Sequence, residues 1–430
     1  MACYKVPWKN IEDSIGENIH NIGPSILILV LIGAIGGSWM ASGIVPTLIV
    51  YGLKVLSPKI FLFAACLICA FVSVMTGSSW TTIATLGVAL VAIGQALGFS
   101  AALSAGAVIS GAYFGDKISP LSDTTVLASS SVGVPLFEHI NYMLKTTGPA
   151  FVIASVIYLV ISVLHPSGGV TDVAQVESVM RQTFNISPWL LVVPLITGVL
   201  IWKKVPAILT LLAAAVMAAL TALIAQPHIV AEISGIPGPL TAGSAFKGLT
   251  LMLADSTSIQ TGSDAMDSLV ATGGMKGMLL TVFLIICAAT FGGSLVGSGM
   301  IHSLTDALIK RISSRGGVVG ATIMTGFLSN ICMGDQYLSI VLTTRLYKEM
   351  YEKRGFEPRL LSRSTEDSAT VTSVLIPWNS CGMTQSTVLR VPTLSYAPLC
   401  FFNILSPLVS LISAFVHTRV TRVCTKTTSS

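Results

Sequence analysis

The sequence has 430 residues, of which 53% are hydrophobic and only 10% are charged. A soluble domain carries roughly 25% charged residues, and a water-soluble chain of this size could not cover its surface with so few. The formal net charge of +5 follows from basic loops rather than from nucleic-acid binding. Composition therefore predicts an all-α polytopic membrane protein and excludes a soluble protein or a nucleic-acid-binding module.

Long apolar runs recur along the chain. Each approaches the ~20 residues that a helix needs to cross the hydrocarbon core of a bilayer. The runs lie at 26–50, 151–164, 207–225, 278–295 and 400–416. Residues 1–21 carry five charges and no apolar core, so they predict an interfacial stretch rather than a signal peptide. We expect about 8–10 membrane helices plus hairpins.

Basic clusters set the predicted orientation, because Lys and Arg accumulate on cytoplasmic loops. The clusters lie at 203–204, 310–315, 345–363 and 419–426. The connections 165–187 and 226–274 hold one basic residue each and are predicted to lie outside. This path places the C-terminus in the cytoplasm. It also requires residues 316–344 to enter and leave the membrane from one side, as a hairpin.

The second half of the chain resembles the first. Gly37 to Gly43 shares four of seven residues with Gly293 to Gly299, at an offset of 256. The charge pattern runs the first crossing outward and its counterpart inward, which predicts two inverted repeats, each with a hairpin and a broken transmembrane helix, as in secondary transporters. Chance similarity of glycine-rich helices remains the alternative. The paired segments are 37–43 with 293–299, 76–80 with 332–336, and 115–125 with 364–373.

These features divide the chain into five predicted parts. The N-terminal and C-terminal ends are an interfacial segment and a cytoplasmic tail, and the two repeats flank connecting helices with an external loop. The boundaries are 1–23 for the interfacial segment, 24–140 for the first repeat, 141–275 for the connection, 276–417 for the second, inverted repeat and 418–430 for the tail.

Acidic side chains within interrupted apolar segments are the candidate functional residues, since an ionisable group at the bilayer centre costs at least ~2.5–3.5 kcal/mol. Pro120 and Pro377 break the helices there, and unwound backbone at that depth must line a cavity or be buried in protein. Carboxylate, hydroxyl and amide oxygens are hard ligands that suit an alkali cation. The candidate cation- and proton-binding residues are Asp116, Ser119, Asp123, Thr124, Asp335, Glu366, Asp367, Thr370 and Asn379, with Gly77, Ser78, Ser79 and Thr81 at the hairpin tip.

Each candidate has a structural alternative. Asp116 could form an ion pair with its neighbour Lys117, and Asp335 could cap an arm of the second hairpin. Glu366 and Asp367 could be interfacial. Asn379 could satisfy the backbone groups freed by the helix break. The eight cysteines and six histidines show no paired spacing, so we expect neither disulfides nor a bound metal beyond a transported cation.

Three motifs resemble the NhaC family of sodium/proton antiporters, within the ion-transporter superfamily. They are Thr76-Gly-Ser-Ser-Trp-Thr-Thr82, Gly115-Asp-Lys-Ile-Ser-Pro-Leu-Ser-Asp-Thr-Thr125 and Ile376-Pro-Trp-Asn-Ser-Cys-Gly382. The likeness covers nearly the whole chain. Two residues depart from the family pattern, Ala369 for a glycine and Val374 for a proline. Family members also carry about two further membrane helices before the segment that begins this sequence.

The resemblance implies a secondary antiporter in the cell membrane, not an enzyme, which exchanges Na⁺ or a similar monovalent cation for H⁺ without a cofactor. A sodium- or proton-coupled malate/lactate-type carboxylate antiporter is the alternative, because the family includes such transporters. Sodium and protons would compete for one cluster built from Asp116 and Asp123 on one repeat and Glu366 and Asp367 on the other. Rocking of one repeat against the other would give alternating access. Homo-oligomerisation stays open.

Overall fold

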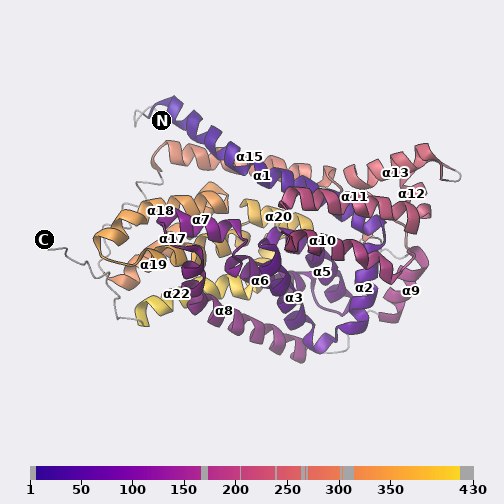
Figure 1. Ribbon diagram of the computed structural model, residues 1–430, viewed down its shortest axis with the longest axis horizontal. Coiled ribbons are helices and arrows are strands. Elements are labelled where there is room, and N and C mark those ends of the chain that lie inside the picture. The colour runs from indigo at the N-terminus through magenta and orange to yellow at the C-terminus, as the bar shows by residue number, and fades with distance from the viewer. Residues whose placement is uncertain are drawn as a thin grey trace.

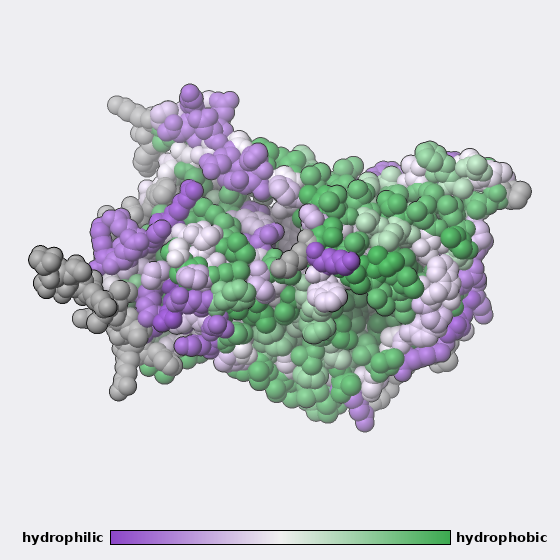
Figure 2. All heavy atoms as spheres, in the orientation of Figure 1, coloured by the Kyte–Doolittle hydropathy of each residue, from purple (hydrophilic) through white to green (hydrophobic). Residues whose placement is uncertain are grey.

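The computed structural model describes residues 6–165, 173–203, 205–237, 240–262, 270–300 and 314–416, together with Asp267 and Ser303. This part of the chain is helical and has no strand, only an isolated bridge between Thr257 and Thr272. Seven of its helices are long and apolar enough to cross a membrane, or up to nine if each bent pair counts as one span. Apolar residues form a broad band between two more polar ends (Figure 2). The predicted all-α polytopic fold is confirmed.

The first third of the chain forms the hairpin and broken helix that the sequence predicts. Helix α1 runs without interruption from Trp8 to Ala41, so the expected boundary at residue 23 falls within a helix. The following elements are α2 (Ile44–Val55), α3 (Phe61–Thr76), α4 (Ser79–Thr82), the π-helical η3 (Ile83–Gly87), α5 (Val88–Ala96), α6 (Ala101–Ile118), α7 (Asp123–Val132) and α8 (Leu136–Leu164).

The remaining elements comprise a connecting group and a second hairpin with its broken helix. The connecting helices are α9 (Val173–Thr183), α10 (Val192–Trp202), α11 (Ala207–Ala225), α12 (Pro227–Ser234) and α13 (Ala242–Ala254). The second group is α15 (Leu279–Gly297), α17 (Arg315–Met333), α18 (Gln336–Lys353), α19 (Pro358–Thr365), the π-helical η6 (Glu366–Thr370), η7 (Ser373–Leu375), α20 (Ser380–Leu389), α21 (Thr393–Tyr396) and α22 (Phe401–Val416). The predicted tail lies outside the described residues.

An internal repeat is visible in the order and length of the elements. From the first hairpin onward, several element boundaries recur 257 positions later. The repeated positions include the ends of α3 and α17 at Thr76 and Met333, the starts of α6 and α19 at Ala101 and Pro358, and the starts of α7 and α20 at Asp123 and Ser380. The left-handed residues Gly77 and Gly98 recur as Gly334 and Gly355. This register differs from the sequence interpretation, because it places residues 115–125 opposite 372–382 rather than 364–373, and so sets Pro120 opposite Pro377.

The two hairpins lie at different places along the long axis of the molecule. In Figure 1, α17 and α18 lie toward the left and α3 and α5 lie to the right of them, near the middle. Helix α18 packs against α7 of the first repeat, and α20 packs against η3 and α5, so each hairpin contacts the short arm of the other repeat. The arrangement is consistent with the predicted inverted repeats.

Helix α1 and its neighbours form a layer along one side of the molecule (Figure 1). It packs against α15, α11 and α13. A Cβ atom added at Gly293 or Gly297 of α15 would lie 2.7 Å from the Cα of Ile15 or Ile11, so these glycines let the two helices touch. Gly293 and Gly297 are therefore close-packing residues between α15 and α1.

Helices α3 and α6 approach even more closely, which brings the hairpin tip to the end of α6. A Cβ atom added at Gly111 would lie 2.0 Å from the carbonyl oxygen of Cys66, and one at Gly115 would lie 2.3 Å from that of Ala70. Neither contact can be relieved by a side-chain rotation, because both involve backbone. These glycines thus fix the distance between the two elements that carry the candidate site.

We expect Gly111→Val to destabilise the protein by at least the ~1–3 kcal/mol typical of overpacking, because α6 must move away from α3. Melting of the purified protein, followed by size-exclusion chromatography after heating, measures this effect. Gly148→Val is the matched control, since a Cβ atom there meets nothing within 4 Å. Equal melting temperatures for the two variants would contradict the proposed contact.

Candidate functional site

The tip of the first hairpin meets the break between α6 and α7. Gly77 ends α3 in a left-handed conformation (φ +67°), and a Cβ atom there would lie 2.6 Å from the backbone of Leu121. Ser78 caps α4 by accepting the Thr81 N–H (3.2 Å). Only glycine combines this backbone angle with so close an approach, which explains the Thr-Gly-Ser-Ser pattern of the tip.

Asp116 joins the hairpin tip to the helix break. One carboxylate oxygen accepts the Ser79 N–H (3.0 Å) and the Ser79 hydroxyl (2.7 Å), and the other accepts the Ser122 hydroxyl (2.6 Å). The side chain is only 5% exposed. The predicted site residues Asp116 and Ser79 are thus in direct contact, although 37 residues separate them.

Asp123 lies on a cavity of about 270 Å³ beside Asp116. The Asp123 side chain is exposed, whereas that of Asp116, which also lines the cavity, is buried. Ser122 and Thr124 share a hydrogen bond of 3.0 Å next to it. The oxygen-bearing residues that line the cavity are Ser25, Thr76, Ser78, Thr81, Asp116, Ser122, Asp123, Thr124, Thr210, Gln336 and Tyr337. This Asp116–Asp123 cavity can offer a cation two carboxylates and several hydroxyls.

Lys117 and Asp367 form a fully buried ion pair. The Lys117 ammonium donates to the Asp367 carboxylate and to the hydroxyl of Ser406 (2.9 Å). The other Asp367 oxygen accepts the Thr146 hydroxyl (2.9 Å) and lies 3.6 Å from Nε of Arg363. Lys117 therefore pairs with Asp367 of the second repeat and not with its neighbour Asp116, the pairing that the sequence left open.

Glu366 is fully buried one residue before this ion pair. Neither of its carboxylate oxygens has a hydrogen-bond partner among the described residues, and the Thr370 hydroxyl also lacks one. Both residues belong to η6, a π-helical turn of the kind often found at functional sites. Both the Glu366 and the Asp367 side chains are 0% exposed, so they face the protein interior.

Asp335, Asn379 and Ser119 hold the second hairpin and the breaks in place. Asp335 caps α18 by accepting the Tyr337 and Leu338 N–H groups (2.9 and 3.1 Å), and it accepts the Ser380 hydroxyl (2.9 Å). Asn379 caps α20 through the Cys381 N–H (3.0 Å). The Ser119 hydroxyl donates to the Val74 carbonyl (2.7 Å). The structural alternatives given for Asp335 and Asn379 are therefore confirmed.

The two repeats use the same positions with exchanged residue types. In the register of 257, Asp116 and Ser79 correspond to Ser373 and Gln336, and the Ser373 hydroxyl donates to the Gln336 side chain (3.3 Å). Ser78 and Asp123 correspond to Asp335 and Ser380, and the Ser380 hydroxyl donates to the Asp335 carboxylate (2.9 Å). The contact between positions 79 and 116 thus recurs between positions 336 and 373, whereas the acidic residues stand at different positions in the two halves. The corresponding positions in the two repeats are 78 and 335, 79 and 336, 116 and 373, 122 and 379, and 123 and 380.

Several residues that build the site were not predicted from the sequence. Thr146 and Ser406 complete the Lys117–Asp367 network from α8 and α22. Asn330 on α17 donates to the Ala369 carbonyl (2.7 Å) and the Thr372 hydroxyl (3.0 Å), and so supports η6. Arg363 lies four residues before Asp367, a spacing at which helical side chains meet. That spacing could have predicted the contact between Arg363 and Asp367. The sequence has no comparable feature that would predict the contacts of Thr146 and Ser406.

Comparison with known proteins identifies the family. The profile of the Na⁺/H⁺ antiporter family matches residues 1–129 and 111–417. The Na⁺/H⁺ antiporter NhaC of Bacillus subtilis is 35% identical over 95% of this chain and 88% of its own. The NhaC protein of Alkalihalophilus pseudofirmus is also 35% identical, over 96% and 86%. The malate-2H⁺/Na⁺-lactate antiporter of B. subtilis is 35% identical over 95% and 84%. The resemblance inferred from the motifs is confirmed, and the chain belongs to the Na⁺/H⁺ antiporter family.

Proposed function

We propose that the protein is a secondary active antiporter that exchanges Na⁺, or a similar monovalent cation, for H⁺ across the cell membrane by alternating access. The observation that carries this proposal is the Asp116–Asp123 cavity at the junction of a hairpin tip and a helix break. The activity named for the two NhaC relatives supports it. The apolar helices support a multi-pass location in the bilayer, and we propose the cytoplasmic C-terminus from the basic loops.

Exchange requires that a cation and a proton exclude one another from the same groups. Asp123, exposed in the cavity, can act as a direct cation ligand, with hydroxyl oxygens of Ser122 and Thr124 beside it. Protonation of a carboxylate removes the charge that attracts the cation and places a donor among the ligands. A site built on Asp123 and Asp116 therefore holds either Na⁺ or H⁺, which is the thermodynamic basis of antiport.

The buried ion-pair network would serve a second role next to this cavity. Glu366 interacts electrostatically with Lys117, Asp116 and Asp367. Burying a carboxylate charge without a hydrogen-bond partner is costly, which makes Glu366 the candidate for a proton-carrying group. Asp367, in contrast, forms a buried ion pair with Lys117. We therefore assign Asp367 to holding the two repeats together rather than to binding Na⁺.

Proton movement in everted membrane vesicles tests the proposed exchange. Respiration establishes a pH gradient that quenches acridine orange, and added NaCl is expected to restore fluorescence only in vesicles that contain the protein. KCl measures the selectivity for the cation. Equal fluorescence recovery with and without the protein would reject sodium/proton exchange.

Carboxylate exchange is the second candidate, favoured by the name of one relative, the malate-2H⁺/Na⁺-lactate antiporter. Lys117, the basic residue next to Asp116 in the sequence, is fully buried in its pair with Asp367. An anion at the cation site would therefore lack a cationic partner there. Uptake of labelled malate in exchange for lactate, driven by a sodium gradient, distinguishes this function from simple cation exchange.

A further inference from the structure

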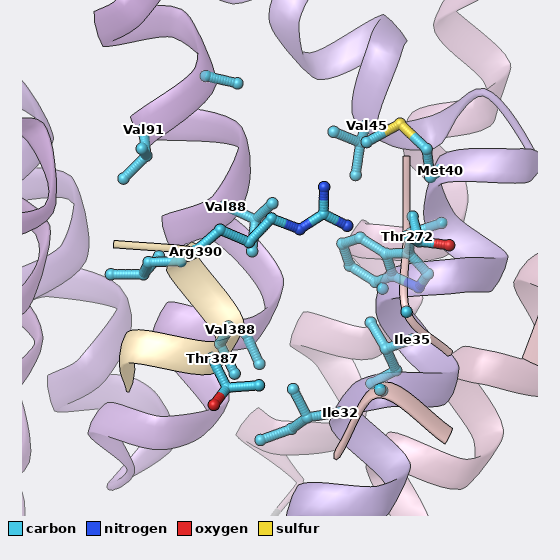
Figure 3. Close-up of a pocket in the computed structure, with 18 of the residues that line it drawn as sticks. Ile32, Ile35, Met40, Val45, Val88, Val91, Thr272, Thr387, Val388 and Arg390 are labelled. Carbon is cyan, nitrogen blue, oxygen red and sulfur yellow. The ribbon is translucent and has the colours of Figure 1, made fainter. Parts of the chain in front are cut away.

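Two cavities border α1 in the described part of the chain, and they differ in their polar lining. The larger, of about 790 Å³, lies between α1, α5 and the end of α20 (Figure 3). Aliphatic side chains such as Ile32, Ile35 and Val88 line it, and none of its lining residues, all of which the structure describes, is acidic. The carboxylates that can bind a cation line the smaller Asp116–Asp123 cavity, so a further cation ligand must lie on the wall of that cavity.

The second repeat reaches the Asp116–Asp123 cavity at the tip of its hairpin. Its residues Gln336 and Tyr337 line the cavity. Both lie in the first turn of α18, which packs against α7, the helix that begins at Asp123. The Gln336 side chain accepts the Ser373 hydroxyl (3.3 Å) and is thus engaged within its own repeat. Tyr337 is therefore the residue through which the second repeat can offer a side-chain oxygen to the cavity.

The Tyr337 side chain is half-buried beside the two carboxylates of the cavity. The hydrogen bond that Tyr337 forms with the described residues comes from its backbone N–H and not from its hydroxyl. Its phenol group interacts electrostatically with Asp123, Asp116 and Asp335. A tyrosine hydroxyl has an acceptor oxygen, and hard oxygen ligands suit an alkali cation. Tyr337 thus adds a neutral oxygen to the carboxylates of the proposed cation site.

The helix break of the second repeat fixes the backbone of Tyr337. The Asp335 carboxylate accepts the N–H groups of Tyr337 (2.9 Å) and Leu338 (3.1 Å). It also accepts the hydroxyl of Ser380, at the start of α20 (2.9 Å). Asp335 is therefore a positioning residue, because it holds Tyr337 at the cavity through the helix cap.

Tyr337 has a counterpart on the first hairpin. In the register of 257 it corresponds to Trp80, which lines the same cavity. The indole N–H of Trp80 is buried and has no hydrogen-bond partner among the described residues. An indole N–H can only donate, whereas a phenol oxygen can also accept. Of these two aromatic residues, Tyr337 is therefore the one that can bind a cation through an oxygen.

We propose that the Tyr337 hydroxyl is a ligand of the cation in the Asp116–Asp123 cavity, so that the binding site is built from both repeats. The inference rests on the proposed cation exchange and names a ligand of the same site. A cation held in this way would join the tip of the second hairpin to the helix break of the first repeat. Occupancy of the site would therefore be communicated to both repeats.

Binding of radiolabelled sodium to the purified, detergent-solubilised protein tests this ligand without any transport step. Tyr337→Phe removes the hydroxyl, keeps the ring and leaves the backbone hydrogen bond to Asp335 in place. We expect the Na⁺ affinity to fall about three- to tenfold, the loss expected for one neutral oxygen contact. The ratio of the two affinities should be the same at each pH, because Asp116 and Asp123, which would take up the proton, are unchanged.

Tyr51→Phe is the matched control, since Tyr51 is also half-buried but lies on α2 and lines neither cavity. Its Na⁺ affinity should equal that of the wild type. Unchanged affinity in Tyr337→Phe, an equal fall in Tyr51→Phe, or an affinity ratio that varies with pH would overturn the ligand role alone. Absence of saturable sodium binding to the wild type would instead reject the proposed cation exchange together with this ligand.

Discussion

Asp123→Asn is expected to abolish sodium-dependent proton movement in everted vesicles. The substitution keeps the size of the side chain but removes the more exposed of the two carboxylates that line the Asp116–Asp123 cavity. A charge-assisted interaction is worth about 1.5–3 kcal/mol, so the apparent Na⁺ affinity should fall by at least about tenfold even where some exchange persists. Fluorescence recovery after NaCl additions of increasing concentration measures both quantities.

The variant should remain folded, because the Asp123 carboxylate forms no hydrogen bond or ion pair with the described residues and lies in the first turn of α7. Asp13→Asn is the matched control, since Asp13 is an exposed carboxylate on α1 away from the cavity. Asp123→Glu, which restores the charge, should recover part of the activity. Wild-type exchange by Asp123→Asn would remove Asp123 from the proposed cation site.

Lys117→Met is expected to be the most destabilising single substitution in the site. It leaves the Asp367 carboxylate fully buried with no ammonium partner, and breaking a buried ion pair in this way costs about 3–5 kcal/mol. Replacing both partners, as in Lys117→Met with Asp367→Asn, should recover most of that loss, because the amide still offers an acceptor to Thr146. Thermal melting of the three purified proteins measures the difference.

The control for this series is Lys145→Met, which removes an exposed lysine from α8. Its melting temperature should stay within a few degrees of the wild type, since surface charges contribute little. If the double substitution melts as low as Lys117→Met alone, the stabilising role of the pair is incorrect. In that case the loss would come from the packing of the lysine stem.

Local features of the fold were predictable from the sequence. The Thr-Gly-Ser-Ser tip and the helix break at Pro120 follow from backbone properties of glycine and proline, and both are found where expected. The sequence also identified the acidic residues of both repeats. These signals are local, because they depend on a few adjacent residues.

Contacts between distant residues were not predictable in the same way. Lys117 has an acidic neighbour in sequence at Asp116, but its partner Asp367 is 250 residues away. Lys117 pairs with Asp367 because α6 and η6 lie side by side in the core. A single sequence does not reveal which helices are neighbours in the fold. The correct repeat register was also missed. The pairing of 115–125 with 364–373 followed the acidic residues, whereas the fold aligns Pro120 with Pro377.

The ion-paired centre ties the two repeats together. Lys117 lies on α6 and Asp367 on η6, and the network extends to α8 through Thr146 and to α22 through Ser406. Drawing α6 away from η6 would leave a buried charge without its partner, at a cost of several kcal/mol. Rocking of one repeat against the other, which the sequence suggested, would have to break this link.

Two cavities, of about 790 and 270 Å³, in contrast border α1. One lies between Ile32 and Met40 of α1 and the helices α5 and α20, and the other lies between Ser25 of α1 and the first hairpin tip. A void removes packing contacts from the surfaces that face it, so this boundary is the easier one along which to slide. In an alternating-access cycle the two ion-paired repeats would then move as one rigid body along the α1 layer, and the bound cation would cross the membrane with them.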